Sequence, residues 1–156
     1  MHLHEPIVRQ LLEKAKVAAE RAYSPYSGFA VGAAVLAEDG STYVGANVEN
    51  ASYGLTLCAE RVAAAQAVAA GVRRLRAVVV YTPTAAPATP CGACRQFLNE
   101  FGPEMDVFCF CRGDGVLQAR LSELLPSAFG RANLGASAAE GAPPAVPPSL
   151  GEGHLL

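Results

Sequence analysis

The spacing of hydrophobic residues changes along the chain, and each change marks a predicted element. Residues 5–22 carry an apolar stripe at helical spacing, with Pro6 in the first turn, where a proline is tolerated. Residues 29–50 form two β-rich runs on either side of Asp39 and Gly40, a dipeptide typical of tight hairpin turns. The first third of the chain therefore predicts a helix followed by a β-hairpin.

The following segments alternate between helical and strand-like patterns. Residues 57–70 predict a helix that ends near Gly71. Residues 75–82 form a continuous apolar run of strand length, which predicts a buried central strand. Residues 90–102 predict a short helix that begins at a proline. Two further strands and a last short helical segment are expected over 106–111, 115–121 and 122–130.

This order of elements predicts an α/β domain with a layered architecture. We expect a mixed sheet of about five strands, because a hairpin joins antiparallel strands and a wholly parallel sheet has none. From about residue 131 the composition shifts to Gly, Ala and Pro, with few residues that a core could bury. We therefore predict one domain over residues 1–130 and a disordered tail over 131–156.

Bulk composition narrows the possible functions. A chain of 156 residues fits one domain with a real core, and its formal net charge of −2 argues against nucleic acid as the main partner. The sequence contains no apolar run that is long enough to span a membrane, and no apolar signal region. We therefore expect a cytoplasmic protein without a membrane partner. In such a reducing compartment we expect its five cysteines to be metal ligands, catalytic groups or buried thiols rather than disulfides.

Three of these cysteines have the positions of a metal site. Cys91 and Cys94 are three residues apart at the start of a predicted helix, and Cys58 opens another. Helix N-termini favour thiolate over thiol, and thiolates are ligands of Zn²⁺. The three histidines lie near the chain ends, so any such site is built without imidazole. Three protein ligands would leave the fourth tetrahedral position for water.

Charged residues next to these cysteines favour a catalytic site. Glu60 lies two residues after Cys58, in a first helical turn where both side chains can reach a ligand that approaches end-on. It can take the proton of a zinc-bound water, whose pKa falls from about 15.7 to about 7 in favourable sites. Arg61 and Arg95 are assigned to hydrogen bonds with the thiolates, which would draw charge from an electron-rich zinc.

Five stretches resemble the small homotetrameric zinc-dependent cytidine deaminases, and they stand in that family's order across residues 5–130. They are SPYSGFAVGAA, NVENASYG, CAER, PCGACRQF and ELLPSAFG. The resemblance implies a three-layer α/β/α sandwich with one zinc ion per subunit and a homotetramer with composite active sites. It also implies hydrolytic deamination of cytidine and deoxycytidine to uridine and deoxyuridine, with release of ammonia, in pyrimidine salvage.

The resemblance assigns roles to individual residues. The zinc ligands and the proton shuttle are matched by Cys58, Cys91, Cys94 and Glu60. The substrate-binding positions are matched by Phe29, Asn47, Glu49, Tyr53, the backbone at Ala59, and Phe129. Asn47 and Glu49 would hold ribose hydroxyls, a role that suits an amide and a carboxylate and that would repel a phosphate, so a free nucleoside is the expected substrate. Tyr53 and Phe129 would come from neighbouring subunits.

Blander interpretations stay open for several residues. Cys109 and Cys111 alternate with phenylalanines on a predicted strand, so we expect buried thiols, and they are the candidate fourth ligands if the zinc is structural. Phe29 and Asn47 would by themselves be a core residue and a strand-end turn residue. Three other functions remain as alternatives: deamination of another aminopyrimidine, a structural zinc or binding module, and nucleic-acid editing.

Overall fold

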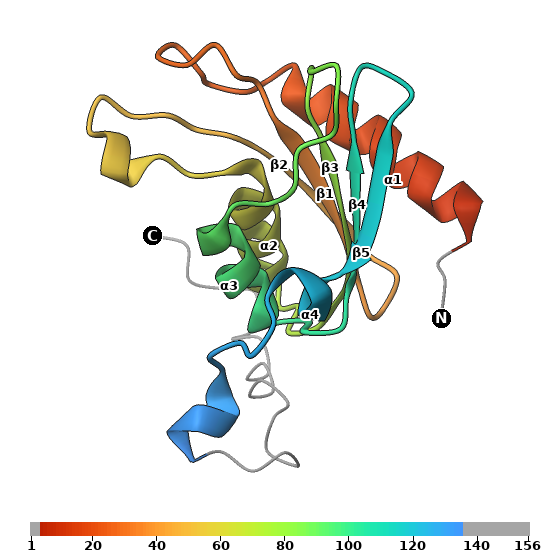
Figure 1. Ribbon diagram of the computed structural model, residues 1–156, viewed down its shortest axis with the longest axis vertical. Helices are drawn as coiled ribbons and strands as arrows, with labels where there is room; N and C mark the ends of the chain where they lie inside the picture. Colours follow the sequence, from red (N-terminus) through yellow and green to blue (C-terminus); the bar gives the residue numbers. More distant parts are fainter. Residues whose placement is uncertain (1–3, 136–156) are drawn as a thin grey trace, which may run out of the picture.

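The computed structural model describes residues 4–135, which form a mixed sheet of five strands (Figure 1). The strands are β1 (Gly32–Ala37), β2 (Thr42–Ala46), β3 (Leu75–Tyr81), β4 (Asp106–Phe110) and β5 (Val116–Arg120). Their order across the sheet is β2-β1-β3-β4-β5, with β3 and β4 parallel and the other neighbouring pairs antiparallel. This arrangement confirms the mixed sheet predicted from the sequence.

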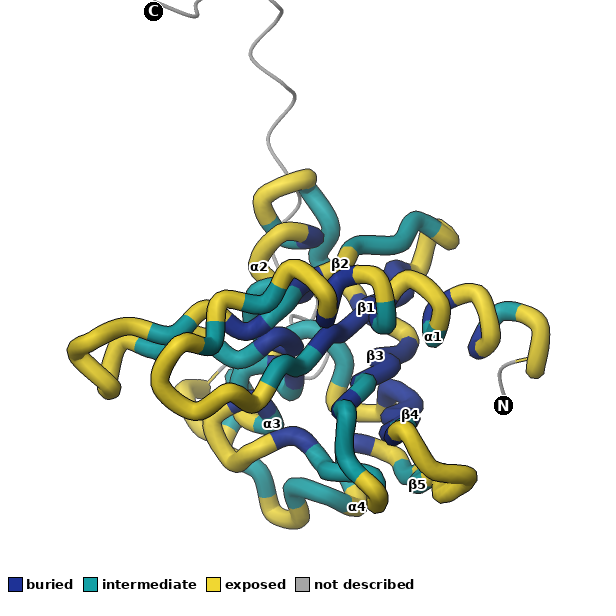
Figure 2. The backbone as a smooth tube through the Cα atoms, turned by 90° about the horizontal axis from the view of Figure 1, so that it is seen from above, coloured by how far each residue is buried: buried dark blue, intermediate teal, exposed yellow. Residues whose placement is uncertain are grey.

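Helices cover both faces of the sheet. They are α1 (Glu5–Ala19), α2 (Ala59–Ala69), α3 (Gly92–Asn99) and the short α4 (Leu121–Leu124). Figure 1 shows α1 on one side of the sheet and α2 and α3 on the other. Successive side chains of β1 point to opposite faces of the sheet. Ala33 and Val35 face the core shared with α2, while Ala34 and Leu36 face the core shared with α1. Figure 2 shows the buried positions gathered along β1, β3 and β4, so the three-layer α/β/α sandwich is confirmed.

A close contact between the sheet and α2 fixes the helix. Gly45 of β2 is buried, and a β-carbon on it would lie 2.4 Å from the backbone nitrogen of Ala63 and 2.5 Å from the carbonyl oxygen of Ala59. Only glycine fits there without moving the helix. Because Ala59 is the first residue of α2, this contact sets the position of the N-terminal end of the helix.

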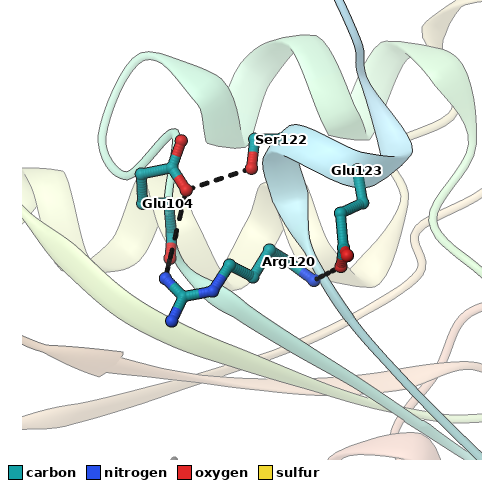
Figure 3. Close-up of polar contacts among 4 residues, drawn as sticks. All are labelled: Glu104, Arg120, Ser122 and Glu123. Atoms are coloured by element: carbon teal, nitrogen blue, oxygen red, sulfur yellow. Dashed lines mark hydrogen bonds and ion pairs between the residues drawn. The ribbon is translucent and has the colours of Figure 1, made fainter. Parts of the chain in front are cut away.

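Polar contacts fix the chain where β5 meets α4 (Figure 3). The backbone N–H of Arg120 donates to Glu123 Oε2 at 2.7 Å, at the start of the helix. Ser122 Oγ donates to Glu104 Oε2 at 3.0 Å, and the Arg120 guanidinium donates to the Glu104 carbonyl oxygen at 3.4 Å. These bonds hold α4 against the loop before β4, and α4 in turn contacts α3.

The predicted helices and strands are all present, with differences at their ends. Helix α1 ends at Ala19 and α3 at Asn99, a few residues earlier than predicted. The last helical segment, predicted over 122–130, is helical only to Leu124, where α4 ends. Two short 3₁₀ helices, Tyr53–Leu55 and Arg131–Leu134, are not predicted from the sequence. The second lies at the start of the predicted disordered tail, and the remainder of that tail, 136–156, lies outside the described residues. Among the described helices, none has the length and hydropathy that a membrane span requires.

Candidate active site

The N-terminal ends of α2 and α3 bring three cysteines together. Cys58 immediately precedes α2 and Cys91 immediately precedes α3, both with extended backbone, while Cys94 lies in the first turn of α3. Their sulfur atoms all lie within 4.8 Å of one another, and the Cys58 and Cys91 sulfurs are 3.9 Å apart. Cys94 is buried, Cys58 is partly exposed and Cys91 is exposed, so the cluster is open on one side.

The geometry of this cluster fits a zinc ion. Zn–S bonds of about 2.3 Å in a tetrahedral site put two sulfur ligands about 3.8 Å apart, close to the observed separation of Cys58 and Cys91. Within residues 4–135 no fourth His, Cys, Asp or Glu side chain joins the group. Three thiolates with an open fourth position suit a catalytic zinc site, and soft sulfur ligands favour zinc over harder cations such as magnesium. These residues therefore fit one zinc ion per subunit.

Hydrogen bonds stabilise the thiolate form of Cys58. The Cys94 thiol and the Arg61 guanidinium donate to the Cys58 sulfur and lower the pKa of the Cys58 thiol to about 5. Arg61 Nη2 lies 3.6 Å from that sulfur and also donates to the Thr56 carbonyl oxygen at 3.3 Å. The pKa of Cys94 is raised, because its thiol donates to Cys58 and because its burial disfavours a second anion. A bound cation would reverse this effect and deprotonate the coordinating thiols.

Glu60 places a buried carboxyl group beside the cysteines. It lies in the first turn of α2 and is only 5% exposed. The Cys94 sulfur lies 3.8 Å from Glu60 Oε2. Burial raises the pKa of the Glu60 carboxyl, because the charged form loses its hydration. A carboxyl group that holds its proton more tightly than usual, next to a metal site, is suited to moving protons in a reaction.

The two arginines assigned to the thiolates differ in their contacts. The Arg61 guanidinium lies against the Cys58 sulfur, where the sequence places it. Arg95 instead donates to oxygen atoms: the carbonyls of Pro90 and Leu124, both at 2.7 Å, and Thr89 Oγ1 at 3.0 Å. A planar guanidinium with several donors suits such a junction of oxygen acceptors. Arg95 therefore ties the chain that leads into Cys91 to the end of α4, and the expected contact of Arg95 with a thiolate is not observed.

A cavity of about 280 Å³ adjoins the cysteine cluster, and its walls include Cys58, Glu60 and Cys91. Four of the residues assigned to substrate binding also line it: Phe29, Asn47, Glu49 and Ala59. Thr82 and Val31 complete part of the wall, although the sequence gives no signal for either. The volume is close to the lower limit of small-molecule sites, which is about 300 Å³. The structure thus brings most of the predicted site residues to one cavity.

Tyr53 and Phe129 do not line this cavity. Tyr53 is 73% exposed and Phe129 is 58% exposed. Tyr53 lines a second cavity of about 200 Å³, which shares Ser27, Glu49 and Thr56 with the first. The Phe129 carbonyl oxygen accepts a hydrogen bond from Gln96 Nε2 at 2.9 Å. A single chain therefore leaves both aromatic side chains outside its own cysteine-lined cavity.

Asn47 supports the neighbouring loop as well as lining the cavity. It is 7% exposed, its Oδ1 accepts from the Val31 N–H at 2.8 Å, and its Nδ2 donates to the Phe29 carbonyl oxygen at 2.7 Å. The amide keeps one further lone pair and one further N–H. Asn47 therefore holds the backbone of the neighbouring loop, as a turn residue would. Its amide can still accept one hydrogen bond from a ligand and donate one to it.

Glu49 is held by donors from a loop distant in sequence. It accepts from the backbone N–H groups of Tyr26 at 3.0 Å and Ser27 at 3.1 Å, and from Ser27 Oγ at 2.5 Å. The Ser27 hydroxyl, followed by these N–H groups, lowers the pKa of the Glu49 carboxyl, so the group is anionic at neutral pH. Ser27 was not assigned from the sequence, because its partner lies 22 positions away and no local pattern connects the two.

The remaining cysteines lie outside the cluster, which confirms their interpretation as buried thiols. Cys109 is fully buried, and this burial raises the pKa of its thiol to about 12. The Cys111 sulfur lies between 3.3 and 3.5 Å from the carbonyl oxygens of Ala85, Gly113 and Gly115, any one of which can accept its S–H. Neither belongs to the three-cysteine group, so neither provides a fourth ligand.

Comparisons with known proteins show which family the chain belongs to. The family model for the cytidine and deoxycytidylate deaminase zinc-binding region matches residues 7–111. A cytidine deaminase of Sporosarcina psychrophila is 45% identical over 128 residues, 81% of this chain and 94% of that protein. One of Halalkalibacterium halodurans is 48% identical over 122 residues, 78% of this chain and 92% of that protein. The crystal structure of a cytidine deaminase from Burkholderia pseudomallei matches with a TM-score of 0.75 and 48% identity, covering 78% of this chain and 98% of that one. The chain therefore belongs to the cytidine and deoxycytidylate deaminase family.

Proposed function

We propose that this protein is a zinc-dependent cytidine deaminase acting in pyrimidine salvage in the cytoplasm. It hydrolyses the C4 amino group of cytidine and deoxycytidine, so that nucleoside and water give uridine or deoxyuridine and ammonia. The observation that carries the proposal is the buried Glu60 carboxyl beside the three-cysteine cluster, in the wall of a cavity of about 280 Å³. Relatives named cytidine deaminase, 45% and 48% identical to this chain, support it.

The residues of the chain supply metal binding and proton transfer. Cys58, Cys91 and Cys94 hold one zinc ion, which supplies the Lewis acidity that makes water nucleophilic near neutral pH. Glu60 accepts a proton from the attacking water and delivers it to N3 of the pyrimidine ring. Because burial raises its pKa, the carboxyl group is suited to hold this proton. It then takes the proton of the new C4 hydroxyl and passes it to the C4 amine, so that the C4–N bond breaks, ammonia leaves and the C4 carbonyl forms. Such transfers typically contribute about 10²–10⁴-fold to a rate.

The cavity chemistry favours a free nucleoside over a nucleotide. Glu49 is anionic and Asn47 is a neutral amide, and both suit sugar hydroxyls. Among the described residues that line the cavity there is no lysine or arginine, so a phosphate would meet the Glu49 charge without a compensating cation. Phe29 would place its ring against the substrate, and the backbone at Ala59 would contact the base edge.

We also propose that neighbouring subunits of a homotetramer complete each site. Tyr53 and Phe129, which the resemblance assigns to composite sites, are 73% and 58% exposed in the single chain. Leu55, in the same 3₁₀ helix as Tyr53, is 65% exposed. Large apolar side chains gain free energy from burial, so the exposure of these three side chains supports a covering subunit. With a net charge of −2, nucleic acid is not an expected partner.

Turnover of a small panel of substrates tests the proposal. Zinc-loaded protein is mixed with cytidine, deoxycytidine or cytidine 5′-monophosphate, and the ultraviolet change on conversion to the uracil product is followed. The proposal predicts rapid deamination of both nucleosides and little reaction of the nucleotide. Protein that binds zinc yet leaves both nucleosides unchanged would contradict it, and the function would move to another aminopyrimidine or to a structural zinc module. Sedimentation of the same sample tests the tetramer.

A further inference from the structure

Ser27 joins two groups that the proposed function assigns to the substrate. Its hydroxyl donates to Glu49 Oε2 at 2.5 Å and accepts from the backbone N–H of Phe29 at 3.0 Å. Its own backbone N–H donates to Glu49 Oε1 at 3.1 Å. Ser27 and Glu49 line both the cavity beside Cys58 and the cavity beside Tyr53. One serine therefore connects the carboxylate and the aromatic residue on this side of the site.

The backbone brings Ser27 to this position. Tyr23 forms backbone hydrogen bonds with 47–49, so the segment before Ser27 runs beside the segment that carries Glu49. Gly28 has a φ of 67°, in the left-handed region that glycine adopts without strain. The chain turns back at this glycine, and the N–H of the next residue meets the Ser27 hydroxyl.

The donors around Glu49 determine what remains for a ligand. A carboxylate offers about four lone-pair positions. Oε1 takes the N–H groups of Tyr26 and Ser27, and Oε2 takes the Ser27 hydroxyl, so one position on Oε2 remains. A serine has a single O–H to donate, and Ser27 uses it on Glu49. Ser27 therefore orients the carboxylate, and Oε2 keeps one position that can accept from a ligand.

We propose that Ser27 is a positioning residue, which fixes the Glu49 carboxylate so that its free lone pair meets a sugar hydroxyl of the nucleoside. This inference deepens the proposed function and rests on it, because the ligand is the deaminase substrate. The same hydroxyl holds the Phe29 backbone in register with Glu49, so two substrate contacts depend on it. The hydroxyl in question is the 2′ or 3′ hydroxyl, so a nucleoside that lacks both gains little from Ser27.

The test compares two substrates with three forms of the full chain. The ratio kcat/KM is measured for cytidine and for 2′,3′-dideoxycytidine with the wild-type protein, Ser27→Ala and Ser27→Thr. Loss of a hydrogen bond to a charged group typically changes an equilibrium by about tenfold or more. Ser27→Ala is expected to lower kcat/KM for cytidine about tenfold, mainly through KM, and that for the dideoxynucleoside less than about twofold. Ser27→Thr retains the hydroxyl and is expected to stay close to the wild type.

Ser41→Ala is the matched control. Ser41 donates to Asp39 Oδ1 from its hydroxyl at 2.5 Å and from its backbone N–H at 2.9 Å. Ser27 donates to Glu49 through the same two groups. The pair lies in the hairpin turn, outside the two cavities that Ser27 lines, so both substrates should be unaffected. Melting curves establish that each variant is folded.

The outcomes separate this inference from the proposed function. If the wild-type protein deaminates cytidine but Ser27→Ala loses equally on both substrates, or loses nothing on cytidine, the positioning role alone is overturned. A wild-type protein that shows no preference for cytidine over the dideoxynucleoside overturns it as well. A wild-type protein that deaminates neither substrate removes the proposed function and this inference together.

Discussion

Replacing Gly45 by alanine should disturb the active site through the packing of α2. The added β-carbon would lie 2.4 Å from the Ala63 nitrogen and 2.5 Å from the Ala59 carbonyl oxygen, whereas ordinary contact begins at 3.4 Å. The helix must therefore withdraw by about 1 Å, and overpacking of this kind typically costs about 1–3 kcal/mol. Because Ala59 lies between Cys58 and Glu60, the displacement reaches the reacting groups, where about 1 Å can cost 10²-fold in rate.

Thermal unfolding and cytidine turnover of the same Gly45→Ala sample measure both effects. We expect the melting temperature to fall by about 2–4 °C for each kcal/mol lost. Gly54→Ala is the matched control for strain within one chain, because a β-carbon at Gly54 meets no atom of that chain within 4 Å and its backbone φ is not positive. Gly45→Ala protein with wild-type stability and turnover would refute the argument that this glycine sets the position of α2.

Two further predictions concern the metal site. Arg61→Met should weaken zinc binding about 10–100-fold in competition with a chromophoric chelator, because it removes the donor to the Cys58 sulfur. Arg74→Met, at an exposed position, should leave zinc affinity unchanged. Equal losses of zinc affinity in both variants would contradict the role of Arg61 as a donor to the Cys58 sulfur. After zinc removal, Cys58 should be alkylated nearly as fast at about pH 6 as at about pH 8, since a pKa of about 5 leaves it a thiolate at both. Cys109, buried and with a pKa of about 12, should stay unmodified, and mass spectrometry after digestion distinguishes the two.

The fold could be predicted from the sequence because its elements have clear local patterns. The apolar runs of β1 and β3 indicate strands that are buried on both faces, without knowledge of any partner. The exact ends of helices depend on tertiary contacts, and α1 accordingly stops at Ala19 although the apolar stripe continues to Ala22. The 3₁₀ helix Tyr53–Leu55 has no periodic pattern long enough to indicate it.

Residues of the site differ in how much a local pattern reveals. Cys91 and Cys94 carry their own signal, because three-residue spacing at a helix start places both side chains on one side. Arg95 follows them in sequence, yet its guanidinium turns to oxygen atoms supplied by the preceding loop and by α4. The acceptors of the Arg95 guanidinium depend on where the preceding loop and α4 lie in the fold. No sequence pattern near Arg95 predicts these positions. Ser27 is a second such case, since its partner Glu49 belongs to a different segment.

The structural zinc alternative is weakened by the ligand count. Structural sites are usually closed by four protein ligands, whereas within residues 4–135 the cluster has three. Cys109 and Cys111, the candidates for a fourth ligand, lie outside the group. A buried carboxyl group such as Glu60 is costly to a structural site and useful to a catalytic one, because its raised pKa suits proton transfer.

The most direct test of the central claim is to measure zinc content and cytidine deamination on one sample of Glu60→Gln. The amide keeps the shape of the side chain and removes its ability to accept and deliver the proton. We predict one zinc per chain, as in the wild type, with kcat/KM lowered by at least about 10²–10⁴-fold. Glu100→Gln, an exposed change beyond the end of α3, should keep full activity. Glu60→Gln protein that retains both zinc and near wild-type turnover would contradict the account, and so would loss of the zinc, since Glu60 would then be needed to hold the metal.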